Sequence, residues 1–207
     1  MINIKRIVNF ETDQNCFLVY DKNKKGVIID PGNKFEVIKE EIKNENVTVE
    51  YILLTHCHYD HIECLEELRN FLSAQVVASF ECNKNIQKPT VNLSSLFSDV
   101  IKANPADIIV NDNDFFNAGE MKIKTIYTPG HTNGSVCYLI ENELFSGDTL
   151  FLRSVGRCDF PTGDEIVLRN SILNKIYTLD DEIIVHPGHG NDTKIYYEKW
   201  YNMYVKG

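Results

Sequence analysis

The segment YILLTHCHYDH, residues 51–61, joins an apolar run directly to a dense group of histidine and aspartate residues. The run Tyr51–Thr55 has the length and the continuous apolar character of a strand that is buried on both faces. Residues two apart on an extended segment point the same way, so His56 and His58 can bind one cation together. The segment therefore predicts a metal site at the end of a buried strand.

Further residues of the same chemical type follow in tight turns. Asp60 and His61 lie where the chain turns into a helix, and they could bind a second cation. His131, Asp148 and His189 each occur in or beside a turn that follows a predicted strand. Imidazole and carboxylate ligands without a thiolate suit borderline cations such as zinc, iron, manganese or cobalt.

The rest of the chain shows short β-rich runs first and a strand–helix alternation afterwards. We expect strands at residues 4–9, 16–20, 26–30, 51–55, 75–79, 121–127, 135–140, 144–145 and 182–185, and helices at 34–43, 62–72, 80–87, 164–179 and 193–204. Thr162 and Glu165 fit a capping box. Residues 89–117 are rich in Pro, Asn, Ser and Asp, and we expect an irregular flap over the histidine cluster. The pattern predicts one domain, residues 1–207, folded as a four-layer α/β/β/α sandwich of two mainly antiparallel sheets with helices outside.

Composition excludes several classes of protein. The 207 residues are 43% hydrophobic and 25% charged, which is typical of a globular domain rather than a disordered chain. The net charge of −9, without a dense basic run, argues against binding of nucleic acid, and no stretch is long and apolar enough to cross a membrane. The start, MINIKRIVNFETDQN, lacks the apolar core of a secretory signal. We therefore expect a cytoplasmic protein whose six cysteines are reduced.

Four motifs occur in an order and at spacings that resemble the metallo-β-lactamase superfamily. They are the cluster His56–His61, Thr128-Pro129-Gly130-His131-Thr132, Ser146-Gly147-Asp148-Thr149 and Pro187-Gly188-His189-Gly190. Asp30-Pro31-Gly32 resembles the early aspartate motif of the same superfamily. The resemblance extends over about residues 15–190 and implies an αββα sandwich with metals at the edge between its two sheets.

The resemblance also implies a set of ligands for two divalent cations, with zinc as the expected metal and iron or manganese as alternatives. The first cation would take His56, His58 and His131, and the second would take Asp60, His61 and His189. Asp148 would bridge the two cations, and Asp30 matches a position that orients a metal ligand. Asp60 is in addition a candidate catalytic residue that orients the nucleophile or carries a proton.

The segment from Gly147 to Asp164 is similar to that of the glyoxalase-II-like group, especially its short bacterial members. In that group a basic residue at the position of Arg157 faces the substrate, where it can pair with a carboxylate of a glutathione-like thiol carrier. Arg157 and Asp159 are therefore candidate substrate-binding residues. An equally good interpretation is that these two side chains pair with each other and brace their loop.

The activity that the resemblance implies is hydrolysis of a small-molecule thioester, such as an S-acyl-glutathione, by a hydroxide that bridges two metals. Two alternatives stay open. One is a persulfide dioxygenase that holds a single iron through His56, His131 and Asp148, and the other is a metallo-hydrolase of the same fold that acts on a different substrate. Neither nucleic acid nor a membrane is an expected partner, and the oligomeric state is left open.

Overall fold

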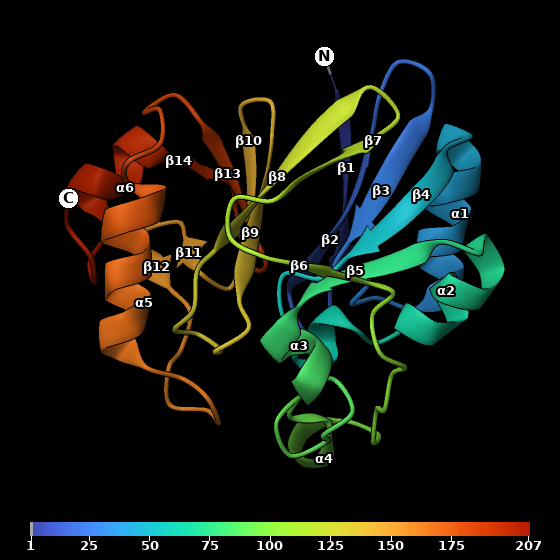
Figure 1. The fold of residues 1–207 in the computed structure, drawn as a ribbon, viewed down its shortest axis with the longest axis horizontal. Helices are drawn as coiled ribbons and strands as arrows, with labels where there is room; N and C mark the ends of the chain where they lie inside the picture. The colour runs from blue at the N-terminus through green and yellow to red at the C-terminus, as the bar shows by residue number, and fades with distance from the viewer. Residues whose placement is uncertain (1) are drawn as a thin grey trace.

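Two six-stranded sheets lie face to face between outer helices in the computed structural model, which describes residues 2–207 (Figure 1). The first sheet has the order β1 (Asn3–Asn9), β2 (Gln14–Tyr20), β3 (Lys25–Ile29), β4 (Thr48–Leu53), β5 (Gln75–Ser79) and β6 (Ile108–Val110). The second has the order β7 (Phe115–Ala118), β8 (Met121–Tyr127), β9 (Val136–Ile140), β10 (Glu143–Gly147), β13 (Ile184–Pro187) and β14 (Thr193–Lys194). A separate small ladder pairs β11 (Leu150–Phe151) with β12 (Ser154–Val155). The expected four-layer sandwich is confirmed.

The outer layers consist of helices on both sides of the sandwich. Helices α1 (Phe35–Glu45) and α2 (Leu65–Leu72) cover the first sheet, and α5 (Glu165–Ser171) and α6 (Ile195–Tyr201) cover the second (Figure 1). Helix α5 continues into a π-helical turn, Ile172–Ile176. Two short helices, α3 (Phe80–Asn85) and α4 (Ser94–Phe97), connect β5 with β6. None of the helices within residues 2–207 has both the length and the apolar character needed to cross a lipid bilayer.

The strand directions in the first sheet differ from the expectation of a mainly antiparallel arrangement. Strands β1, β2 and β3 pair antiparallel, whereas β3, β4, β5 and β6 pair parallel. The parallel strands are joined by helical crossovers, which is the connection that parallel pairing requires. In the second sheet β10 and β13 form a parallel pair and the other pairings are antiparallel.

Strand β2 shows how the sandwich is held together, because every residue in it is buried. Cys16 and Leu18 pack into the cluster beneath the outer helices, and Phe17 and Val19 pack into the cluster between the two sheets. Phe17 contacts Phe145 of β10 edge-on, with ring centroids 5.2 Å apart. A strand that is covered on both faces has a continuous run of apolar residues, whereas a strand with one exposed face alternates apolar and polar residues.

Two local expectations were wrong. Residues 89–117 are not irregular throughout, since they contain α4, β6 and part of β7. The capping box is also wrong, because the residue that caps α5 is Asp164, whose Oδ1 accepts a hydrogen bond from the backbone N–H of Val167 at 3.0 Å. A carboxylate beside the positive end of a helix satisfies that end better than a hydroxyl two residues further away.

Candidate metal centre

All the predicted metal ligands lie at one edge of the sandwich, just beyond the ends of four strands. His56 and His58 follow β4, and His131 follows β8. Asp148 comes directly after β10, and His189 comes two residues after β13. Strands β10 and β13 are parallel neighbours, with Gly147 opposite Pro187. Asp148 and His189, which follow these two residues, therefore lie close together.

The first group of ligands consists of three buried histidines. One nitrogen from each of His56, His58 and His131 lies within 4.8 Å of the others. His131 Nε2 is 2.9 Å from His58 Nδ1. Burial lowers the pKa of His56, and it lowers that of His58 to about 3. Neutral imidazoles are the form that binds a cation.

The second group consists of Asp60 and His61, from the turn Tyr59–His61, together with His189. His189 Nε2 lies 3.2 Å from Asp60 Oδ2 and 3.4 Å from His61 Nε2. Burial opposes ionisation of Asp60, but the neighbouring His61 and His189 outweigh it and lower the pKa of the carboxyl. This second group therefore offers two ring nitrogens and a carboxylate.

Asp148 spans the two groups. Its Oδ1 lies 3.3 Å from His61 Nε2 in the second group, and its Oδ2 lies 3.5 Å from His131 Nε2 in the first. Burial raises the cost of its charge, yet His189 and His61 outweigh that cost and hold its pKa well below the usual value. An ionised carboxylate thus lies between two clusters of ligand atoms.

The buried ligand atoms are arranged to bind cations, because the surrounding residues that the structure describes do not satisfy all of them with hydrogen bonds. Within residues 2–207, His56 Nε2 is buried and has no hydrogen-bond partner. A buried polar atom without a partner is costly, and a cation held by His56, His58 and His131 would remove that cost. Donors of the two groups are nitrogen and oxygen only, which suits zinc, iron or manganese.

Asp30 lies behind the ligands instead of among them, although its carboxylate is also close enough to His56 and His61 to share a cation. Its Oδ1 accepts from the backbone N–H of Thr55 at 2.7 Å, and its Oδ2 accepts from the Thr55 hydroxyl at 2.6 Å. The same Oδ2 lies 2.9 Å from His61 Nδ1. Because both of its oxygens are engaged in this way, Asp30 fixes the ring of His61. The Nε2 atom of His61 then points toward the other ligands of the second group.

Sequence reasoning missed the groups that orient the other histidines. His56 Nδ1 lies 3.1 Å from the hydroxyl of Thr55. His131 Nδ1 donates to the carbonyl of Arg157 at 2.6 Å, and His189 Nδ1 donates to the carbonyl of Thr12 at 3.1 Å. Thr55 could have been noticed as the polar last residue of the apolar run, whereas a backbone carbonyl leaves no signal in a sequence.

Five of the seven predicted ligands line a cleft of about 480 Å³. Besides His58, Asp60, His131, Asp148 and His189, its walls include Tyr59, Leu93, Phe97, Phe151, Ser154, Val155, Arg157 and Phe160. The cleft is thus open to a small molecule and is rich in aromatic side chains.

Arg157 and Asp159 form an ion pair at the mouth of the cleft. Arg157 Nε lies 2.9 Å from Asp159 Oδ1, and Nη2 lies 2.7 Å from Oδ2, with both side chains about 65% exposed. The guanidinium also lies 4.3 Å from the centroid of the Phe160 ring. The two side chains therefore pair with each other, as one interpretation expected, and Arg157 borders the cleft as well.

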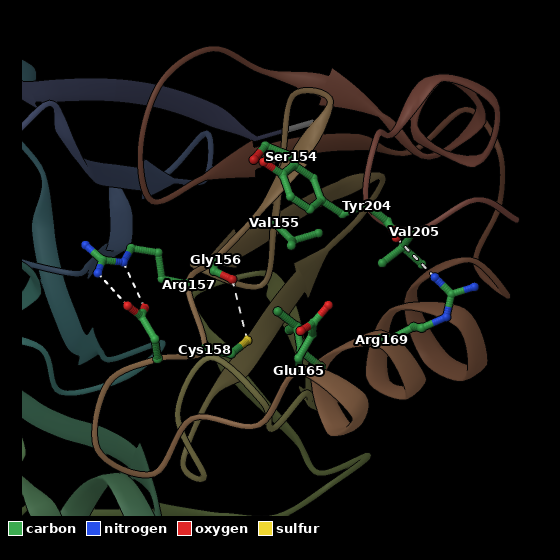
Figure 2. A pocket seen from close by; sticks show the side chains of 11 residues that line it. Ser154, Val155, Gly156, Arg157, Cys158, Glu165, Arg169, Tyr204 and Val205 are labelled. Carbon is green, nitrogen blue, oxygen red and sulfur yellow. Dashed lines mark hydrogen bonds and ion pairs between the residues drawn. The ribbon is translucent and has the colours of Figure 1, made fainter.

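A second cavity of about 480 Å³ lies behind the same loop (Figure 2). It shares Ser154, Val155 and Arg157 with the metal cleft. Figure 2 shows Arg157 and Arg169 on opposite sides of this cavity. Gly156 lines the cavity and packs closely against two metal ligands, since a Cβ placed on it would lie 1.9 Å from the Asp148 carbonyl and 2.9 Å from His131 Nδ1.

Comparison with known proteins identifies the family. The model of the "Metallo-beta-lactamase superfamily" matches residues 10–189. The chain belongs to the metallo-beta-lactamase superfamily. It is 33% identical over 184 residues to the Bacillus subtilis protein named probable metallo-hydrolase YqgX, covering 87% of each chain. It is also 32% identical over 213 residues to the Haemophilus influenzae protein named hydroxyacylglutathione hydrolase GloC, covering 99% of this chain and 98% of that protein.

Solved structures of the superfamily share the same fold. The BLEG-1 B3 metallo-beta-lactamase is 35% identical, with a TM-score of 0.94 over 99% of this chain and 100% of that chain. ETHE1 from Myxococcus xanthus is 28% identical, with a TM-score of 0.82 over 98% and 84%. TTHA1623 in a di-iron-bound form is 27% identical, with a TM-score of 0.86 over 97% and 100%.

Proposed function

We propose that this protein hydrolyses thioesters of a small thiol, such as an S-acyl-glutathione, with two divalent cations, and that zinc is the metal. The observation that carries the two-metal part is the position of the Asp148 carboxylate between the two groups of ligand atoms. The thioester part is supported by the relative named hydroxyacylglutathione hydrolase, which is similar to almost the whole chain.

The complete second group favours two cations over one. A single iron held by His56, His131 and Asp148 would leave Asp60 and His189 without a function, although their side chains converge to 3.2 Å. In our proposal the first group would hold one cation, the second group would hold the other, and Asp148 would be a ligand of both. When bound, the cations would lower the pKa of a shared water to about 7 and polarise the thioester carbonyl.

The chain's own residues orient the metal ligands and the attacking water, and they accept its proton. Asp30 and Thr55 prevent rotation of His61, and the Arg157 carbonyl prevents rotation of His131. Asp60 is ionised and lies at the cleft, so its carboxylate can accept the proton of the attacking water and orient that water toward the carbonyl carbon.

Arg157 supplies a cation for the thiol half of the substrate. Its ion pair with Asp159 is exposed, and exposed pairs contribute little to stability, so a substrate carboxylate can take the place of Asp159. Arg157 also lines the second cavity, which offers further room for the thiol half of the substrate. Six free cysteines, five of them buried, also support our inference that the protein works in the reducing cytoplasm.

The test combines metal analysis with an assay of turnover. We expect about two equivalents of zinc in protein purified without added metal, and hydrolysis of S-acyl-glutathiones followed by release of the thiol. Asp148→Ala should lose metal and turnover together, whereas Glu36→Ala, at an exposed ion pair with Lys39 on the outer helix α1, should lose neither. Full metal content and rate in Asp148→Ala would refute the bridging role.

Two alternatives have their own readouts in the same experiment. The sequence left open a persulfide dioxygenase, and one iron per chain with oxygen consumption on glutathione persulfide would support that activity. The similarity to a B3 metallo-beta-lactamase makes a β-lactam the second substrate to include. Turnover of the persulfide or of the β-lactam without turnover of any thioester would refute our proposal and assign the corresponding activity instead.

A further inference from the structure

One wall of the metal cleft is built of apolar side chains that have no part in binding a cation. Tyr59, Leu93, Phe97 and Phe160 line it. The rings of Tyr59 and Phe97 are stacked with centroids 6.0 Å apart, and Phe97 meets Phe160 edge-on at 6.0 Å. Phe160 in turn meets His58 edge-on at 6.0 Å. A continuous run of rings therefore leads from a metal ligand to the outside of the cleft.

The position of this aromatic wall is set by buried polar contacts, not by burial of the rings themselves. The buried side chain of Asn92 donates to the carbonyls of Ile86 and Ile101 at 3.0 and 2.9 Å. The backbone carbonyl of Asn92 accepts from Tyr59 N–H at 2.8 Å, which ties the segment before α4 to the turn that carries Asp60. Leu93 follows in the left-handed region, at φ 66°, where leucine is uncommon.

Phe97 stays 55% exposed in this arrangement. A large apolar side chain held in place beside buried ligand atoms, and still open to solvent, is typical of a surface that binds the apolar part of a ligand. Elsewhere the lining of the cleft differs, because Phe151 lies near His189 with a centroid separation of 6.1 Å, and the charged Arg157 lies against the ring of Phe160.

We propose that the wall formed by Tyr59, Phe97 and Phe160 binds the acyl group of the substrate, and that this group is bulky and apolar, either aromatic or a medium-length alkyl chain. The proposal rests on the function proposed above and adds the class of acyl group. A flat ring or an extended chain can lie against Phe97 while its carbonyl reaches the ligands beside His58. A short acyl group such as acetyl cannot cover the same wall, so it gains less from leaving water.

The experiment compares S-benzoyl-, S-hexanoyl- and S-acetyl-glutathione on the metal-loaded protein. Each value of kcat/KM is divided by the rate of uncatalysed alkaline hydrolysis of the same thioester, which removes differences in intrinsic reactivity. We expect the benzoyl and hexanoyl values to exceed the acetyl value by about tenfold or more. Phe97→Ala should reduce this ratio by about tenfold, and Phe97→Leu should give an intermediate ratio.

Leu96→Ala is the matched control, because Leu96 is 65% exposed on the same helix and does not line the cleft. Its ratio and its rates should equal those of the wild type. Circular dichroism and thermal melting check that each variant is folded, and the ratio itself is unaffected by a loss of active protein.

The outcomes separate the two proposals. Equal normalised values for all three thioesters would overturn the acyl assignment and leave thioester hydrolysis standing. A loss of preference in Phe151→Ala instead of Phe97→Ala would also overturn it, since the acyl group would then lie against Phe151. Absence of turnover with every thioester would overturn the proposed function, and the acyl assignment with it.

Discussion

Oδ2 of Asp30 lies 2.9 Å from Nδ1 of His61, and both side chains are buried. The contact joins the end of β3 to the turn after β4, 31 residues apart in the chain. Because Thr55 donates to both oxygens of Asp30, the carboxylate has little freedom to move. The orientation of one ligand thus depends on a side chain that does not face the cleft.

Asp30→Asn should weaken the second group of ligands selectively. The amide keeps the shape of the side chain but removes its charge and one acceptor oxygen, so we expect affinity for one of the two metals to fall by about 10- to 100-fold. Competition with a chelator, followed by metal analysis, measures the stepwise loss. Glu36→Gln is the control at the exposed pair with Lys39 on α1. Unchanged affinity for both metals would show that Asp30 does not support His61.

Removal of metal should destabilise the fold. A cation that binds only the folded chain stabilises it by mass action, and a large excess over its dissociation constant corresponds to about 10 °C in Tm for a chain of this size. We expect treatment with a chelator to lower the melting temperature by about this amount, and added zinc to restore it. His56→Ala should show a smaller shift on treatment with the chelator, since it removes one ligand of the first group, whose buried Nε2 has no hydrogen-bond partner within residues 2–207. Identical melting with and without metal would contradict the two-group assignment.

Gly188→Ala should disrupt the second group by direct contact. A Cβ at this position would lie 2.2 Å from Asp148 Oδ1 and 2.7 Å from His61 Cε1. Both contacts are too short, so these ligands must shift; a shift of about 1 Å can cost about 100-fold in rate, and we expect loss of one metal as well. Gly207→Ala is the control, because its Cβ would meet only the flexible Lys199, at 3.1 Å or more. Full metal content and rate in Gly188→Ala would mean that the loop of His189 adjusts.

Arg157→Gln should raise KM for glutathione thioesters by about tenfold while kcat changes little, because a charge-assisted pair with the substrate carboxylate is lost. Thioesters of N-acetylcysteamine, which lack that carboxylate, should be unaffected. Arg153→Gln, an exposed arginine of the same segment outside the cleft, is the control. An equal effect on both thiols would assign Arg157 to the bracing of its loop alone.

Asp21 should make stability depend on pH in the acid range. Its carboxylate accepts hydrogen bonds from the backbone N–H groups of Glu120, Lys25 and Asn23, and these hold the pKa of Asp21 below its usual value. A lowered pKa in the folded state means that the contribution is complete above the unfolded value of about 4 and is lost as pH falls through the folded value.

Urea unfolding from pH 3 to pH 7 measures this contribution. The difference in unfolding free energy between the wild type and Asp21→Asn should be largest near neutral pH and should shrink on acidification. A difference that stays constant with pH would show that shape, not charge, accounts for the role of Asp21.

The ligand residues were identifiable from the sequence because their chemistry is local. His56 and His58 stand two residues apart directly after a buried run, and that spacing alone places them on one side of an extended segment. The later turns at His131, Asp148 and His189 carry the same types of ligand. Spacing could not supply the positions of α4 or the cap of α5, because segments rich in polar residues and without periodicity depend on distant contacts for their conformation.

The amino-acid order by itself therefore determined which residue types are available as ligands, on which local elements they lie, and which family the chain resembles. The folded structure alone decided that Asp148 stands between the two groups, that Thr55 and Asp30 orient His56 and His61, and that Phe97 lines the cleft. The physical reason is that these relationships join segments as far apart as His61 and Asp148, 87 residues along the chain, and only the pairing directions of the strands and the packing of the two sheets set such distances.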